Sequence, residues 1–151
     1  MEPTDPDAPK LADFLCFAIY SANLAYGKAY KPILDELGVT YTQWITIVAL
    51  WEEDRQTVSS LGAKLFLESN TLTPILKKLE AMGMIRRQRS TEDERQVIVS
   101  LTDAGRALRE RGLQRTLVKA TGLQADEFKN LQKTVARVRD NLVKQTGAGE
   151  E

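Results

Sequence analysis

The sequence has no histidine and a single cysteine, Cys16, among its 151 residues. Without histidine the chain cannot supply a Ser-His-Asp triad, a Cys-His pair or a histidine-ligated metal site. One cysteine also excludes an internal disulfide and a multi-cysteine metal site. A thiol peroxidase must reduce its own thiol, and the chain offers no second cysteine for that step. We therefore expect no enzyme, no cofactor and no metal.

The chain also lacks an excess of charge of either sign, because its 21 Lys and Arg residues balance its 21 Asp and Glu residues. A protein of this kind that binds nucleic acid must concentrate its basic residues locally. No apolar run is long enough to cross a membrane, and the acidic, proline-rich start has no feature of a secretion signal. We expect a cytoplasmic protein without a membrane partner.

Hydrophobic periodicity predicts a mainly α chain with one small β-hairpin wing, the layout of a winged helix-turn-helix. Two short helices are expected at 58–66 and 70–82, joined by a tight turn, with Gly83 ending the second. The side chains expected to face inward are Leu61, Leu65, Phe66, Leu72, Ile75, Leu76 and Leu79. Two strands, at 84–89 and 96–101, then enclose a polar, charged tip.

The helices on either side of this region carry more apolar surface than one small domain needs. A helix from residue 10 to about 29 is apolar around most of its surface, and Pro32 predicts a break or kink after it. Toward the C-terminus, helices are expected at 102–121, with weak points at its glycines, and at 126–143, with the apolar seam of a helix pair. We expect a homodimer with an interface formed by these terminal helices. The alternative is that they pack only within their own chain.

One helix start is specified by two local patterns. Thr40 and Gln43 have the spacing of a capping box, and Val39 and Trp44 occupy the positions of a hydrophobic staple. A helix is therefore expected to begin next to Thr40.

These patterns divide the chain into five functional parts. We expect a flexible arm at 1–9, dimerisation helices at 10–38, a winged helix-turn-helix DNA-binding region at 39–101, dimerisation helices at 102–145 and a flexible tail at 146–151. The helices at 10–38 are also expected to be sensor helices, but only because of the family resemblance described below.

The second short helix has the composition of a DNA recognition helix. The N-terminal turn of such a helix faces base edges in the major groove. Short polar side chains gather there, and lysines suited to phosphates follow one turn later. The predicted DNA contacts of this helix are Ser69, Asn70, Thr71, Thr73, Lys77 and Lys78. The alternative for Ser69 and Asn70 is that they only cap the helix.

The charged hairpin predicts a second DNA contact, made by Arg86, Arg87, Arg89 and Arg95 together with Asp93. A reversed strand pair is long enough to carry an arginine into the minor groove, where A·T-rich sequence enhances the negative potential. Asp93 lies two residues before Arg95 and is close enough to hold its guanidinium. A merely solvated hairpin is the alternative, and the upstream helix-turn-helix favours DNA.

Two further patterns resemble a known family. Asp93-Glu94-Arg95, a following Val/Ile strand and Leu101-Thr102-Asp103-Ala104-Gly105 resemble the signature of the MarR family of winged helix-turn-helix regulators. Residues 61–80, together with an early cysteine and two downstream tyrosines, look more specifically like its OhrR branch of organic hydroperoxide-sensing repressors. The resemblance covers about residues 11–142.

The resemblance implies a repressor that binds a pseudo-palindromic operator in double-stranded DNA as a homodimer. It implies that an organic hydroperoxide oxidises Cys16 to a sulfenic acid, and that Tyr30 and Tyr41 of the other subunit hydrogen-bond this sulfur. Oxidation would then release the operator. Because there is no resolving cysteine, the sulfenic acid should react with a small external thiol or a backbone nitrogen, or oxidise further.

Two alternatives stay open at this point. A MarR-type repressor released by a small hydrophobic or phenolic ligand would leave Cys16 as an inert, structural side chain. Tyr20 and Tyr26 either contribute to sensing or serve only in core or interface packing.

Overall fold

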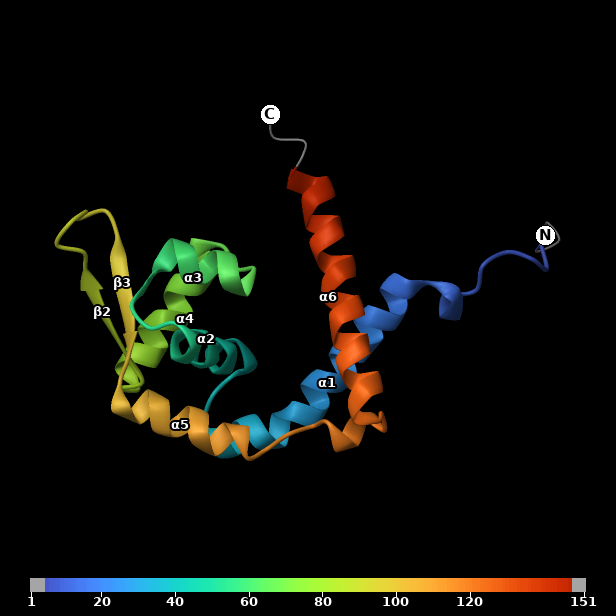
Figure 1. Cartoon of the computed structure of the whole chain (residues 1–151), viewed down its shortest axis with the longest axis horizontal. Helices are drawn as coiled ribbons and strands as arrows, with labels where there is room; N and C mark the ends of the chain where they lie inside the picture. The colour runs from blue at the N-terminus through green and yellow to red at the C-terminus, as the bar shows by residue number, and fades with distance from the viewer. Residues whose placement is uncertain (1–4, 148–151) are drawn as a thin grey trace. The chain divides into compact units, whose positions relative to one another are not determined.

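The computed structural model describes residues 5–147, and the chain forms two compact units that divide between Arg115 and Thr116. The predicted arm and tail lie partly outside the described residues. Figure 1 shows the elements, which in the first unit are η1 (Leu11–Asp13), α1 (Leu15–Leu37), α2 (Tyr41–Glu52), β1 (Gln56–Thr57), α3 (Val58–Leu65), α4 (Ser69–Ala81), β2 (Ile85–Arg89), β3 (Val97–Leu101) and α5 (Asp103–Leu113). The second unit contains η2 (Lys119–Thr121) and α6 (Ala125–Gly147). The mainly α fold with a small hairpin is confirmed.

Helix α1 runs without interruption through Pro32, so the predicted break at that residue is wrong. Proline removes one backbone donor, but Ile33 and Leu34 beyond it are buried in the core, and their packing favours continuation of the helix. The helix also begins later than residue 10, because Phe14 is extended and separates it from the short turn η1. Gly38 ends α1 with a φ of 74°.

The predicted start of α2 is confirmed. The Gln43 amide donates to Thr40 Oγ1 at 3.3 Å, and the Thr40 amide donates to Gln43 Oε1 at 2.9 Å. Val39 and Trp44 are both buried in the hydrophobic core, as a staple requires. This core also contains side chains from α3, α4, α5 and the sheet, so α2 lies at the centre of the first unit.

The helix-turn-helix consists of α3 and α4, and Leu61, Leu72, Leu76 and Leu79 from its two helices are fully buried. Phe66 was predicted to face inward, but its side chain is 57% exposed. The reason is that α3 ends one residue earlier, and Phe66 takes a left-handed φ of 58° that turns it out of the helical register.

Helix α4 begins at Ser69 after Glu68 as the N-cap residue, so Ser69 and Asn70 are not caps. Gly83, with a φ of 76°, follows the end of α4 as predicted.

The hairpin belongs to a three-stranded antiparallel sheet in the order β1-β3-β2. Arg87 on β2 lies opposite Val99 on β3, which is fully buried. Strand β1 was not predicted, because two residues are too few for an alternating pattern. Gln56 in β1 is buried, and its side-chain amide donates to the carbonyls of Ala49 at 3.1 Å and Glu53 at 2.5 Å.

Helix α5 begins after the N-cap Thr102 and ends at Leu113, so the helix predicted to reach residue 121 is too long. Its glycines are close-packing sites and not weak points. A Cβ atom on Gly112 would overlap the six-membered ring of Trp44, and one on Gly105 would overlap the Met84 carbonyl oxygen. Helix α6 confirms the predicted second helix and extends it to Gly147.

Candidate DNA interface and cysteine site

The N-terminal turn of α4 presents the expected polar side chains. Ser69, Asn70 and Thr71 are exposed. Thr73 is half-buried, and its hydroxyl donates to the Ser69 carbonyl oxygen at 2.7 Å, which turns its hydroxyl toward the helix backbone. Three of the four predicted base-reading side chains in this turn are therefore open to a ligand.

One turn further along α4, Lys77 and Lys78 are both exposed. Neither lysine is in an ion pair recorded for the described residues. By contrast, Lys64 on α3 lies 3.5 Å from a carboxylate oxygen of Glu52 and 3.9 Å from one of Glu53. Within residues 5–147, the two lysines predicted to contact phosphates are therefore not paired with a carboxylate, whereas Lys64 is.

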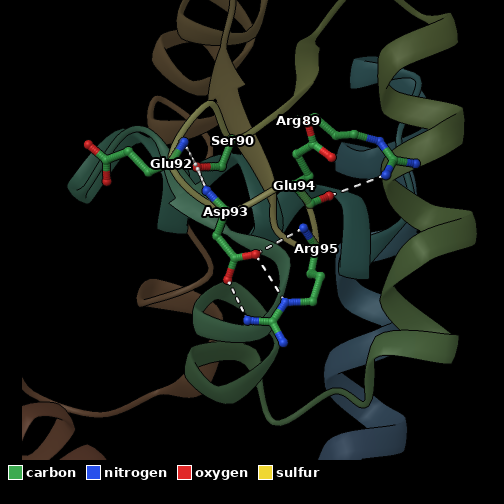
Figure 2. A network of polar contacts seen from close by, with 6 residues as sticks. All are labelled: Arg89, Ser90, Glu92, Asp93, Glu94 and Arg95. Carbon is green, nitrogen blue, oxygen red and sulfur yellow. Dashed lines mark hydrogen bonds and ion pairs between the residues drawn. The ribbon is translucent and has the colours of Figure 1, made fainter.

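The tip of the wing holds Arg95 in a defined position (Figure 2). Asp93 Oδ1 accepts from both the Arg95 amide and its Nε at 3.1 Å, and Asp93 Oδ2 accepts from Nη2 at 3.4 Å. These bonds from Arg95 hold the pKa of the Asp93 carboxyl below its usual value, the side-chain bond having the larger effect. The Arg95 side chain is still 90% exposed. Asp93 thus fixes the orientation of the Arg95 guanidinium while leaving it accessible to a ligand.

The turn that carries this pair is closed by its own hydrogen bonds. Ser90 Oγ accepts from the amides of Glu92 at 3.2 Å and Asp93 at 3.3 Å. The Arg89 guanidinium donates to the Glu94 carbonyl oxygen at 3.2 Å, as Figure 2 also shows. The tip is therefore an ordered turn from which the exposed side chains of Arg89 and Arg95 can each meet a phosphate.

The remaining two wing arginines have different surroundings. Arg86 is exposed. Arg87 is directed toward α4, where Glu80 accepts from its amide, its Nε and its Nη2. Its side chain is 25% exposed. Arg87 thus belongs to an internal contact and not with the other predicted DNA-contacting side chains.

Cys16 is the second residue of α1 and is exposed. Tyr30 and Tyr41 lie close together, with ring centroids 5.7 Å apart, where α1 passes the start of α2. Tyr26 also stacks on Tyr30, at 6.4 Å between ring centroids. Burial, followed by the nearness of Tyr41 and Tyr26, raises the pKa of Tyr30, so its hydroxyl stays protonated at neutral pH.

The predicted tyrosine pair exists, but within one chain it cannot reach the cysteine. Cys16 and Tyr30 both lie on α1, and the rise of an α-helix separates them by about 21 Å along its axis. Only the Cys16 of a second copy can therefore meet this pair. Tyr20 and Tyr26 are exposed, so packing in the core of their own chain is not their role.

The helices expected to form a dimer interface expose large apolar side chains. On α1 these are Leu15, Ile19, Tyr20, Leu24 and Tyr26, and on α6 they are Leu131, Val135, Leu142 and Val143. A helix face of this kind is normally covered by a partner.

Two acidic residues with connecting roles were missed in the sequence. Besides Glu80, Asp54 accepts from the Leu101 amide and from Arg106, both at 2.9 Å, so it joins the β1 loop to the end of β3 and to α5. No local pattern signals partners so distant in sequence. For Glu80, an acid followed by a glycine turn and an arginine-rich strand is a usable signal.

Among residues 5–147 there is no cluster of three His, Cys, Asp or Glu side chains that could hold a metal ion. Within the same residues, no helix is both long enough and apolar enough to cross a membrane.

Comparisons with known proteins agree with this geometry. The family model for SarA/Rot transcriptional regulators matches residues 28–111. The HTH-type transcriptional regulator TtmR of Methylorubrum extorquens is 43% identical over 99% of this chain and 78% of its own. The organic hydroperoxide resistance transcriptional regulator of Bacillus subtilis is 38% identical over 90% of this chain and 94% of its own.

One similar protein has been solved in complex with DNA. Reduced AbfR bound to DNA is 37% identical, with a TM-score of 0.72 over 88% of this chain and 94% of that one, and AbfR has been studied from Staphylococcus epidermidis. AbfR has also been solved in an overoxidized form bound to DNA and in a disulfide form. The fold, the matched family model and these relatives establish that the chain belongs to the SarA/Rot-type, MarR-like family of winged-helix transcriptional regulators.

Proposed function

We propose that the chain is a homodimeric, cytoplasmic DNA-binding repressor that senses organic hydroperoxides by oxidation of Cys16 and then releases its operator. The observation that carries the proposal is the separation of the exposed Cys16 from a tyrosine pair. Cys16 and Tyr30 lie about 21 Å apart along one continuous helix, and Tyr41 of α2 lies beside Tyr30. Such a site is complete only when two chains meet. The similarity to an organic hydroperoxide resistance regulator supports an organic hydroperoxide as the signal.

DNA recognition is divided between two elements. The exposed N-terminal turn of α4 reads bases in the major groove, and Lys77 and Lys78 meet phosphates. The wing carries Arg95, oriented by Asp93, into the minor groove. Two copies related by a two-fold axis place two such units on a pseudo-palindromic operator.

The dimer forms through the terminal helices. Their exposed apolar side chains on α1 and α6 are removed from water by a second copy, and this burial is the main driving force of association. In that arrangement Tyr30 and Tyr41 of one chain donate hydrogen bonds to the Cys16 sulfur of the other. The functional division into 10–38, 39–101 and 102–145 follows from the same proposal.

The sensing reaction is a two-electron oxidation. The Cys16 thiolate attacks one peroxide oxygen, the O–O bond breaks, and a sulfenic acid and an alcohol form after a proton reaches the alkoxide. A small external thiol then condenses with the sulfenic acid to give a mixed disulfide and water. Either product adds atoms to the sulfur and cannot keep the tyrosine bonds of the reduced site.

The fate of the sulfur decides whether DNA is released. Because AbfR has been solved on DNA in an overoxidized form, oxidation alone does not define the releasing species. We expect the bulkier mixed disulfide of Cys16 to release the operator more completely than an overoxidized sulfur. An intersubunit Cys16–Cys16 disulfide is the competing product, and mass spectrometry distinguishes it by the covalent dimer.

The test is an anisotropy titration on DNA from upstream of the chain's own gene, with wild type and Cys16→Ser. Each is measured before and after an alkyl hydroperoxide, with and without a small thiol. Release of wild type alone supports the proposal. If both proteins stay bound and a phenolic acid releases both, the chain is a ligand-released repressor in which Cys16 is structural. If neither binds DNA, the repressor proposal fails.

A further inference from the structure

A second acid–arginine pair connects the recognition helix to the wing. Glu80 is the penultimate residue of α4, and Arg87 is the third residue of β2. Glu80 Oε2 accepts from the Arg87 amide at 2.9 Å, and Glu80 Oε1 accepts from Arg87 Nη2 at 3.0 Å and from Nε at 3.3 Å. One carboxylate therefore binds both the backbone and the side chain of one residue.

The position of Arg87 in the sheet explains why its backbone amide is available to Glu80. In the order β1-β3-β2, strand β2 is an edge strand, so alternate amides of β2 have no neighbouring strand. The Arg87 amide is one of these, and it is satisfied by the helix instead. Between the two elements the chain turns at Gly83, and the Met84 amide donates to the Leu79 carbonyl oxygen at 3.0 Å.

The pair is also shielded enough to hold its geometry. The side chains of Glu80 and Arg87 are 38% and 25% exposed, whereas that of Arg95 at the tip is 90% exposed. Hydrogen bonds from the Arg87 side chain, followed by the one from its amide, keep the pKa of Glu80 below its usual value. The carboxylate thus stays ionised and bonded at neutral pH.

We propose that Glu80 and Arg87 form a clamp that fixes the wing relative to the recognition helix, so that Arg87 is a positioning residue and not a DNA contact. This inference rests on the proposed function, because the clamp matters only if α4 and the wing engage one operator together. A wing held in place before binding loses less conformational freedom on binding, and this raises affinity.

The clamp makes a prediction opposite in sign to simple electrostatics. Removing the negative charge of Glu80 near DNA should tighten binding if only net charge matters. With the clamp, Glu80→Gln weakens operator binding by roughly three- to thirtyfold, because the wing is released. Arg87→Gln weakens it by a similar factor, and the double variant is no weaker than either single variant, because both remove one interaction.

The salt dependence separates a positioning residue from a phosphate contact. Loss of one phosphate contact reduces the slope of log affinity against log salt by about one unit. The clamp predicts an unchanged slope for Arg87→Gln and for Arg87→Lys, which keeps the charge but loses the fork of donors. Arg86→Gln is the matched control on the same strand, and it should lower the slope. Glu92→Gln is the matched acidic control, because Glu92 is exposed at the wing tip and extends away from the other residues in Figure 2.

Two experiments test the clamp. The first is the anisotropy titration of these variants over a salt series, with folding checked by circular dichroism. A tighter Glu80→Gln complex, or a slope lowered by Arg87→Gln with Glu80→Gln neutral, overturns the proposal. The second is amide hydrogen exchange of the DNA-free protein, in which Glu80→Gln should speed exchange of the Arg87 amide. An unchanged exchange rate refutes the clamp, whereas failure of wild type to bind DNA refutes only the proposed function.

Discussion

Replacing Gly112 by alanine tests the packing between α5 and α2. A Cβ atom at this position would overlap Trp44 Cη2 and Cζ3 and lie 3.1 Å from Cζ2, all in the six-membered ring of the indole. Trp44 is itself buried and cannot move aside freely. Overpacking of this kind costs about 1–3 kcal/mol, and alanine recovers at most about 0.5–1 kcal/mol through its higher helix propensity. We expect Gly112→Ala to lower the free energy of unfolding by about 1–2 kcal/mol.

The measurement is urea denaturation followed by circular dichroism, with an unchanged m-value as evidence that only stability has changed. Trp44→Phe provides the control, because phenylalanine lacks the atoms that the new methyl group would meet. In the Trp44→Phe background, Gly112→Ala should therefore cost much less than in the wild type. An equal cost in both backgrounds, or a wild-type midpoint for Gly112→Ala, would refute the steric argument.

Three further predictions concern the DNA interface and the tyrosine pair. Arg95→Ala should weaken operator binding by about 1–3 kcal/mol in an anisotropy titration, and unchanged affinity at fixed salt would remove Arg95 from the interface. Lys77→Gln should lower the salt slope by about one unit without a change in sequence preference, since a phosphate contact carries no sequence information. The pKa of Tyr30 is raised in the folded chain. The protonated Tyr30 hydroxyl therefore contributes fully to the free energy of unfolding below pH about 10, and this contribution is lost as pH rises through the pKa of Tyr30 in the folded chain. Tyr30→Phe should therefore lose less stability than wild type between neutral and alkaline pH in urea titrations, and equal losses would contradict the shift.

Local patterns predicted those elements whose determinants are local. The capping box at Thr40 and Gln43 places the start of α2, and the helical spacing of Leu72, Leu76 and Leu79 identifies the buried face of α4. The pairing of Asp93 with Arg95 was predictable because only one residue separates them.

The errors occurred where a distant contact overrides local preference. Pro32 was expected to break a helix, but the burial of Ile33 and Leu34 carries α1 through it. Strand β1 exists because Gln56 pairs with Val99, far along the sequence. Arg87 was predicted to contact DNA on composition alone, and the fold adds a contact with Glu80 that this prediction did not include. The sequence signal for this contact was the order of an acid, a glycine turn and an arginine-rich strand, and composition alone does not use that order.

The uninterrupted length of α1 has a consequence for how information passes between subunits. The single helix α1 carries Cys16 near its start and Tyr30 about 21 Å further along, and Tyr41 lies beside Tyr30. One chain alone therefore cannot bring the proposed sulfur and tyrosines together. In the proposed two-fold dimer, each chain contributes its sulfur to one sensing site and its tyrosines to the other. A mixed dimer with one Cys16→Ser chain would then retain a single working site. Oxidation of the sulfur in one chain would first change the hydrogen bonds of the tyrosine hydroxyl groups in the other chain.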